Sequence, residues 1–390
     1  MTILAEIVFW SSAFLLFHSY VLYPLLVKIA AWNKRNNNII YPEDDLPGVT
    51  VITAAYNEEE VIGEKLHSII QSVYPAGKIE VLIGSDASDD GTDRIVSGFN
   101  ERNPDIILKR YEYRTGKSPI LNDLKKRARN EIIIFTDANV IFDEHMIFHL
   151  GKHFRNERIS LVGATVVNKG KKSSGISFQE SAYIVRENRI KYLEGIVWGS
   201  VAGAFGACYA IRKKDIPEIP PGFLMEDFYI TLDVISHGNK AICEPDAKCY
   251  EDVSDDIREE FKRKMRISAG NFQNLSVYYP LLFRVFSGAA FSFFSHKVIR
   301  WFGPFLILAS LVCALFVSVW NPFYRVIFFI QVMVMLLPFC DYLSGKLGIY
   351  IKPLRFITHF WMMNLALLTG FFRYLGGIKT NVWIPTKRNV

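Results

Sequence analysis

The sequence predicts an α/β protein in which a mostly parallel sheet, with helices on both faces, is flanked by N- and C-terminal transmembrane helices. Two observations support this fold class. In the middle of the chain, short apolar strand patterns alternate with helical patterns, which is typical of a parallel sheet covered by helices. Before and after that part lie long apolar stretches without charged residues. Half of the 390 residues are hydrophobic and 14% are aromatic, and these stretches explain the apolar excess.

Four uncharged runs are candidates to cross a bilayer, which takes roughly 20 apolar residues. They are residues 7–27, 301–320, 326–340 and 356–372. Trp and Tyr stand at their edges, which favours a membrane over a buried core. A cleaved signal peptide is less consistent with the first run, because the run is too long and no basic cluster precedes it. We therefore expect an integral, multi-pass protein of a bacterial-type inner or plasma membrane.

The chain is expected to divide into three parts. Residues 1–32 form an N-terminal transmembrane helix, residues 33–280 a cytoplasmic α/β domain, and residues 281–390 an interfacial segment with C-terminal transmembrane helices. Basic residues just after the first run place the middle domain in the cytoplasm. Within the last part, residues 281–294 are the best candidate to lie along the membrane surface. The C-terminal topology stays open, since Lys379 and Lys387 favour the inside whereas three spans would put them outside.

Four strands are predicted in the middle domain, and helical patterns separate them. The strands are residues 49–55, 79–84, 105–110 and 131–136, and the helices include residues 58–71 and 118–129. Ligands of such sheets bind beyond the carboxyl ends of the strands. A cleft is therefore expected where these four strands end.

Polar residues follow the predicted strands at that edge. Asp86 follows the second strand, Lys117 lies in "RTGKS" after the third, and Asp137 follows the fourth. An Asp after a strand is commonly a turn or capping residue, so each position alone is a weak signal. Together they predict a metal–diphosphate site, because carboxylates bind a hard cation and the lysine offsets phosphate charge. The sequence contains neither GxxxxGK[ST] nor a GxGxxG after the first strand, which excludes a P-loop and a dinucleotide fingerprint.

Six motifs in this order resemble those of membrane-anchored family 2 glycosyltransferases, whose inverting catalytic domain has the GT-A fold. Such enzymes include the hyaluronan, poly-N-acetylglucosamine and cellulose synthases and non-polymerising relatives. The motifs are "VTVITAAYNEEEVI", "SDASDDGT", "RTGKSPILN", "FTDAN", "MEDFYITLDVISHGNKAICEPDAKCYED" and "RKMRISAGNFQNL". The resemblance extends from residue 49 to about residue 274, and "SHKVIRWFGP" and "WIPTKR" nearer the C-terminus also fit it.

The resemblance implies a nucleotide-sugar donor, most of all a UDP-sugar, and a glycan or lipid-linked acceptor. It implies roles in binding the donor for Ala55, Tyr56, Glu58, Asp86, Lys117 and Asp137. Asp227, in "MED", is the implied general base. Glu226, Arg263 and Arg266 are implied at the acceptor and the diphosphate. An Asp at the predicted start of a helix, residues 227–237, could instead be a helix cap, and both roles are compatible.

Three positions depart from the family pattern. Asn139 stands where the metal motif has its second Asp, although an amide oxygen still suits Mg²⁺ or Mn²⁺ held by Asp137. Arg263 and Ile267 stand where the family has Gln and Trp in QxxRW. Because the Trp helps polymerising members to bind the growing chain, Ile267 weakens the case for a processive enzyme.

The basic helix predicted at residues 259–275 leaves two interpretations open. Phe261, Met265, Ile267 and Phe272 could form its apolar face, with Lys262, Arg263, Lys264 and Arg266 around the rest. These basic side chains would contact either anionic lipid or, for Arg263 and Arg266, the phosphates of the site.

Two other function classes also stay open, a nucleotidyltransferase and an inactive relative that acts as a membrane partner in polysaccharide synthesis or export. The net charge of +6 is explained by the flanks of the spans, so no nucleic-acid partner is expected. Five cysteines without CxxC spacing indicate neither a disulfide framework nor a zinc site.

Overall fold

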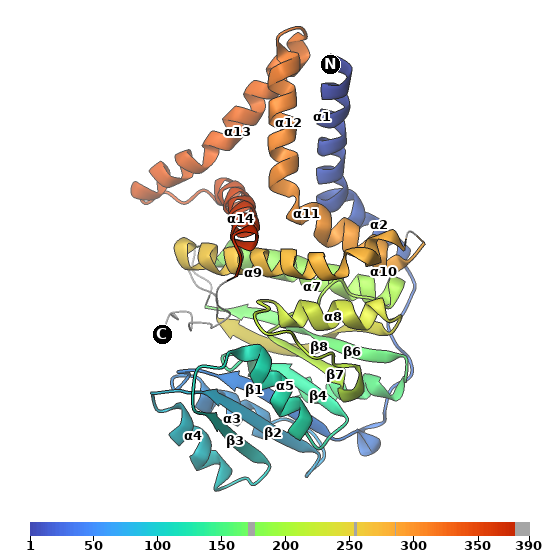
Figure 1. Ribbon diagram of the computed structural model, residues 1–390, viewed down its shortest axis with the longest axis vertical. Coiled ribbons are helices and arrows are strands. Elements are labelled where there is room, and N and C mark those ends of the chain that lie inside the picture. Colours follow the sequence, from blue (N-terminus) through green and yellow to red (C-terminus); the bar gives the residue numbers. More distant parts are fainter. Residues whose placement is uncertain (171–175, 253–255, 285, 379–390) are drawn as a thin grey trace.

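The computed structural model describes residues 1–170, 176–252, 256–284 and 286–378. The α/β domain lies beneath a layer of helices, and long apolar helices extend from the far side of that layer (Figure 1). Lys379, Lys387 and the "WIPTKR" motif lie outside the described residues, so the expectations for the C-terminal end are not addressed by the structure.

The sheet has the strand order β3-β2-β1-β4-β7-β6-β8-β5. The strands are β1 (Val49–Ala55), β2 (Ile79–Asp86), β3 (Ile106–Tyr111), β4 (Ile132–Thr136), β5 (Ile141–Phe142), β6 (Ile159–Lys169), β7 (Cys208–Arg212) and β8 (Lys240–Asp252). The predicted strands correspond to β1–β4, and these four are parallel to one another. The second half makes the sheet mixed, because β7 runs antiparallel to β4 and β6, and β5 runs antiparallel to β8.

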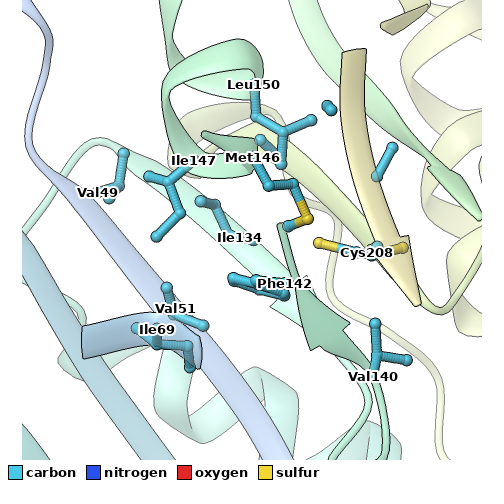
Figure 2. Close-up of a cluster of buried hydrophobic side chains, with 14 of the residues drawn as sticks. Val49, Val51, Ile69, Ile134, Val140, Phe142, Met146, Ile147, Leu150 and Cys208 are labelled. Atoms are coloured by element: carbon cyan, nitrogen blue, oxygen red, sulfur yellow. The ribbon is translucent and has the colours of Figure 1, made fainter. Parts of the chain in front are cut away.

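Helices cover both faces of this sheet, as predicted. The helices of the domain are α3 (Ile62–Ile70), α4 (Thr92–Asn100), α5 (Lys117–Arg127), α6 (Met146–Gly151), α7 (Ser177–Trp198), α8 (Glu226–Ser236) and α9 (Ile257–Tyr278). All residues of β1 are buried, and they alternate between two cores. Val49 and Val51 face the core shared with α3 and α6, whereas Ile52 faces the core shared with α5 and α8. Figure 2 shows the first core, where Ile147 and Leu150 of α6 lie close to the strands.

Four segments at the two ends of the chain form the apolar helices. They are α1 (Thr2–Phe17) with a π-helical turn and α2 (Tyr23–Ala30), α10 (Gly288–Ser292) to α11 (Ile299–Trp301) and α12 (Gly303–Ser318), α13 (Pro322–Lys346), and α14 (Lys352–Leu375). Within the described residues, the segment Thr2–Ala30 and helix α13 are long and apolar enough to cross a membrane. A third candidate is α12, preceded by α10–α11 at a bend of 62°.

The predicted fourth span at residues 356–372 is not supported by the structure. Helix α14 is not among the candidate spans, and its most extensive contacts are with α9. Its charged ends leave too short an apolar core, and its packing needs a one-sided apolar face instead. The described residues of the expected interfacial segment, 281–284 and 286–294, include α10, which contacts α7; their place at a membrane surface stays a prediction.

Buried ion pairs hold the helices of this layer together. The Glu180 carboxylate of α7 accepts from Lys264 of α9 at 2.5 Å and from His359 of α14 at 3.1 Å. Two turns further along α7, Glu187 accepts from Arg300 at 2.6 Å and from Lys297 at 2.9 Å. Removing one partner of a buried pair is costly, so these contacts fix the register of the layer over the sheet.

Candidate active site

The donor side of the site begins where β1 and β2 end. Tyr56 and Asn57 leave β1 after the buried Ala55, and Asn57 has a left-handed φ of 51°, which Asn tolerates. Asn57 Nδ2 donates to Asp89 at 2.6 Å, and the Glu58 amide donates to Thr92 at 2.8 Å. The two strand-end loops are therefore joined into one rim.

Asp86 lies fully buried at the end of β2 and organises the loop after β3. Its carboxylate accepts from the Thr115 amide at 2.5 Å, from the Gly116 amide at 3.2 Å and from Arg114 Nε at 3.1 Å. The Arg114 guanidinium lies 3.3 Å from the centroid of the Tyr56 ring. Asp86 thus connects Tyr56 with the loop that carries Lys117; its role in binding the donor stays a prediction.

Lys117 brings together residues that are far apart in the sequence. Gly116, with φ 87°, makes the turn into α5, and Lys117 is the first residue of that helix. Its Nζ lies 2.7 Å from Asp137 Oδ1 at the end of β4 and 2.5 Å from Glu226 Oε1 at the start of α8. Burial lowers the pKa of Lys117, but the Asp137 and Glu226 carboxylates outweigh it and raise that pKa overall. The lysine is therefore a fixed cation between the two halves of the site.

Asp227 is buried beside this cluster, with 5% of its surface exposed. Burial raises the pKa of Asp227 to about 6, the Glu226 charge acts in the same direction, and Lys117 acts against both. A Cβ on Gly206 would lie 2.9 Å from Asp227 Oδ2, so only glycine leaves room there. A carboxylate with such a pKa is ionised at neutral pH and basic enough to accept a proton from a hydroxyl group.

The two arginines predicted at the site differ in their surroundings. Arg263 is paired with Glu251 at 3.3 Å and with Glu260 at 3.7 Å. Arg266 is half-buried and forms no ion pair with any described residue. Burial lowers the pKa of Arg266, whereas the carboxylates of Glu226, Asp137 and Asp227 favour its charged form. Arg266 thus keeps its donors available next to the acidic cluster.

Of the two interpretations left open for α9, contact with anionic lipid does not fit one of the lysines. Lys262 is exposed and bonds only Glu259 among its described neighbours, at 2.8 Å. The Lys264 side chain, in contrast, is only 10% exposed and lies between Glu180 and Glu260. The charge pattern of the sequence did not reveal this, because the partner Glu180 comes from α7.

The turn after β4 carries the predicted metal ligands. The Asp137 side chain is 38% exposed and Asn139 is half-buried, and the Val140 amide closes the turn on the Asp137 carbonyl at 3.3 Å. A carboxylate and an amide oxygen on one accessible turn fit a hard divalent cation whose remaining ligands are phosphate oxygens. These residues therefore suit the expected Mg²⁺ or Mn²⁺.

A second cluster with metal-like spacing lies elsewhere. His149, Glu244 and Asp246 have ligand atoms within 4.8 Å of one another. The Lys152 ammonium lies 3.0 Å from His149 Nδ1 and 3.5 Å from Glu244 Oε2. The positive charge beside these two residues therefore comes from a lysine of the chain itself.

Several residues of the site were missed by sequence reasoning. Lys191 of α7 is 3% exposed, its Nζ lies 3.1 Å from the centroid of the Phe205 ring, and burial lowers the pKa of Lys191 to about 8. Lys65 of α3 is fully buried. A signal existed for Lys65, because it lies on the same helical face as the apolar Ile62, Leu66 and Ile69.

Two family models match the chain. The model described as "Glycosyl transferase family 2" matches residues 50–219, and "Glycosyl transferase family group 2" matches residues 179–342. The first match includes the strand-end residues up to Asp137, and the second includes Asp227 and the α9 arginines.

Curated relatives include synthases of an N-acetylglucosamine polymer. The poly-beta-1,6-N-acetyl-D-glucosamine synthase of Staphylococcus epidermidis strain ATCC 35984 is 26% identical over 232 residues, which are 58% of this chain and 55% of the relative. The Staphylococcus aureus strain COL enzyme of the same name is 25% identical over 236 residues, 60% of this chain and 56% of the relative. The aligned part thus spans about half the length of these relatives.

A solved structure shares the fold over nearly the whole chain. The mannosyltransferase PcManGT from Pyrobaculum calidifontis, in complex with GDP-Man and Mn²⁺, superposes with a TM-score of 0.71. The identity is 19%, and the superposition covers 95% of this chain and 99% of the other. It shows that the similarity of fold includes the helices outside the α/β domain.

Proposed function

We propose that this chain transfers a sugar from a nucleotide-sugar donor to a hydroxyl group of a glycan or lipid-linked acceptor. Models of glycosyltransferase family 2 and of family group 2, which match residues 50–219 and 179–342, support the proposal. The observation that carries this proposal is the position of Lys117 between Asp137 and Glu226. It joins the strand-end loops, which suit a nucleoside diphosphate, to the helix that begins with the buried Asp227.

Asp227 acts as the general base. The acceptor hydroxyl attacks the anomeric carbon on the face opposite the leaving diphosphate, so the configuration is inverted. As the new bond to oxygen forms, Asp227 takes the hydroxyl proton. Its pKa of about 6 supports this role, because a base works best when its pKa lies near the working pH.

The leaving diphosphate gains negative charge while the bond to the sugar breaks. Lys117 moves from Asp137 to the phosphate oxygens, and Arg266 donates to them with its planar fork. A Mg²⁺ or Mn²⁺ held by Asp137 and Asn139 would supply further charge stabilisation when bound. Arg263 stays paired with Glu251 and keeps that carboxylate from repelling the phosphates.

The membrane is part of the proposed function. Within the described part of the chain, two helices and one bent pair are candidate spans, and the layer of α7, α9 and α14 lies between them and the sheet (Figure 1). We infer a multi-pass protein whose catalytic domain lies on the cytoplasmic side, where nucleotide sugars are made available to it. Membrane lipid would contact the apolar helices, and the acceptor would enter along the layer.

A screen of nucleotide sugars tests this proposal. The purified protein in detergent is incubated with Mn²⁺ and UDP-N-acetylglucosamine, UDP-glucose or GDP-mannose, and release of the nucleoside diphosphate is measured. We expect a UDP-sugar to be used best. Among the UDP-sugars we expect UDP-N-acetylglucosamine first, because the curated relatives are named for a polymer of N-acetylglucosamine. If GDP-mannose were used best, the donor assigned here would be wrong. If no donor were bound and none released its nucleoside diphosphate, the proposed function would be contradicted and an inactive relative favoured.

A further inference from the structure

Lys65 is a buried cation that the mechanism does not yet use. Its side chain is 0% exposed, and it forms no ion pair with a carboxylate among the described residues. Burial lowers the pKa of Lys65, and nearby groups that include Asp137 act in the opposite direction. Burying an ammonium group is costly unless its hydrogen-bond donors are satisfied, so the contacts it makes should explain its presence.

All three donors of the Lys65 ammonium point at one segment of the chain. Nζ lies 2.9 Å from Thr136 Oγ1 and 2.6 Å from the Val140 carbonyl. The third direction faces the Phe142 ring, whose centroid lies 3.5 Å away. An ammonium has three donors, and an aromatic face attracts it. Phe142 itself lies among the core side chains in Figure 2.

These contacts flank the turn that carries Asp137 and Asn139. Thr136 precedes the turn, and Val140 ends it. From the other side, the Ala207 carbonyl accepts from Thr136 Oγ1 at 2.9 Å and from the Asp137 amide at 3.2 Å. The turn is therefore held between α3 and the segment that contains Gly206, next to Asp227.

We propose that Lys65 is a positioning residue of the donor site. From α3 it binds Thr136 and Val140 at the two ends of the Asp137–Asn139 turn, so that the oxygens of the turn reach the metal and the diphosphate in one geometry. This inference rests on the proposed function. Its physical basis is that the Lys65 ammonium contacts Thr136, Val140 and Phe142 at once, whereas an apolar side chain in the same space would leave the Val140 carbonyl without this hydrogen bond. A site that has an amide at Asn139 depends more strongly on such a fixed geometry.

Lys65→Met tests the proposal, and Lys78→Met is its matched control. Methionine keeps the length and fills the core but removes the donors. Lys78 also donates to a backbone carbonyl, that of Leu46 at 2.6 Å. This contact lies near the N-terminal ends of β1 and β2, whereas the site lies at their carboxyl ends. Hydrogen exchange is measured in the ligand-free protein, together with the dissociation constant for Mn²⁺ in the presence of UDP.

We expect Lys65→Met to speed exchange of residues 137–142 by about tenfold or more, since hydrogen bonds to a charged group are lost. The other strands should keep their protection, and Mn²⁺ affinity in the presence of UDP should fall by about tenfold. Lys78→Met should change neither quantity at the turn. Unchanged exchange in Lys65→Met, or an equal rise in all strands, would overturn the proposal.

A second variant covers the case in which Lys65→Met does not fold. Thr136→Val removes the hydroxyl that joins Lys65 to Ala207, and it should speed exchange at the same turn by a smaller factor. Wild-type exchange there would overturn the proposal. If the wild-type protein bound no UDP, the proposed function would be contradicted. The positioning role would then be decided by hydrogen exchange alone, because that measurement needs no ligand.

Discussion

Lys117 Nζ lies 2.7 Å from Asp137 Oδ1, so in the ligand-free protein a lysine covers the carboxylate that the sequence assigns to the metal. The same ammonium contacts Glu226 at 2.5 Å. Asp137 would therefore hold a metal ion only once Lys117 has left it. Lys117 would then turn to the phosphates of the donor, so binding of the metal and binding of the donor would be coupled.

Lys117→Met should separate these two effects. Mn²⁺ alone should bind more tightly, because Asp137 loses its competing partner. Turnover should fall by about 10²–10³, since one charge-assisted contact to the leaving diphosphate is lost. Manganese titration followed by spin resonance and a nucleotide-release assay measure the two quantities.

Lys109→Met is the control for that variant. Lys109 forms a partly exposed pair with Asp123 at 2.8 Å, and such pairs contribute little. Its loss should leave both quantities within about twofold of the wild type. Wild-type turnover in Lys117→Met would remove this lysine from the mechanism.

Asp227→Asn should lower turnover by about 10²–10⁴ while UDP affinity stays the same, because only proton transfer is lost. Asp233→Asn, on the same helix, serves as the control and should keep its activity. Steady-state turnover and UDP titration are measured on both variants. Near-normal turnover in Asp227→Asn would exclude Asp227 as the base.

The pH profile gives an independent check of the base. The pKa of Asp227 is raised to about 6, and a base works only when it is deprotonated. Turnover should therefore be constant above pH 6 to 7 and should fall about tenfold for each unit below pH 6. An acidic limb that persists in the residual activity of Asp227→Asn would have to come from another group.

Gly206→Ala should damage catalysis through the position of Asp227. The added Cβ would lie 2.9 Å from Oδ2 and 3.1 Å from Cγ of that carboxylate, closer than packing allows. We expect turnover to fall by about tenfold or more with little change in donor KM. Gly98→Ala in α4 is the control, because nothing lies within 4 Å of its Cβ, and it should be neutral or slightly stabilising. Equal kinetics in the two variants would contradict the close approach.

The first half of the sheet was predictable because its signals are local. Strands β1, β2 and β4 are short apolar runs, and the run at 131–136 leads directly to Asp137. In the second half, the pairing of the strands has no such local signal. Strand β8 begins at the exposed Lys240 and alternates with polar residues, and its pairing with β6 depends on contacts distant in sequence.

The site was predictable for residues in motifs and not for those that act through packing. Asp137 and Asp227 stand in recognisable patterns, but nothing local indicates that Lys117 joins Asp137 to Glu226. The long apolar stretch of α14 suggested a span, whereas His359 within it reaches the buried Glu180. A hydropathy pattern does not report such a partner, because the pairing is formed by the tertiary fold.

Asn139→Asp should tighten the binding of Mn²⁺ without nucleotide by about tenfold, because a second carboxylate joins Asp137 on the same turn. The variant should remain active. Asp137→Asn is the opposite change and should abolish metal binding at this turn. Isothermal titration of the detergent-solubilised protein measures all three forms. If Asn139→Asp binds Mn²⁺ no better than the wild type, residue 139 does not face the metal.

Arg266→Lys keeps the positive charge but removes the planar fork. If Arg266 donates to the diphosphate, turnover should fall by about 10- to 100-fold, because a bidentate contact becomes a single one. If it only contacts lipid, turnover should hardly change. Its half-buried position without an ion pair among the described residues, beside the acidic cluster, favours the first outcome. Turnover is compared with the fraction of protein that sediments with membranes.

Lys262→Ala and Lys264→Ala complete the Arg266 experiment, and the structure predicts different results for the two lysines. Lys262 is exposed, so its loss should matter little. The Lys264 side chain is only 10% exposed and lies between Glu180 and Glu260, so its loss leaves these carboxylates with only His359 and Arg263 as partners and should lower thermal stability. Wild-type turnover in Arg266→Lys, with activity and membrane association lost together in Lys262→Ala, would instead make α9 a membrane contact whose arginines have no part in the reaction.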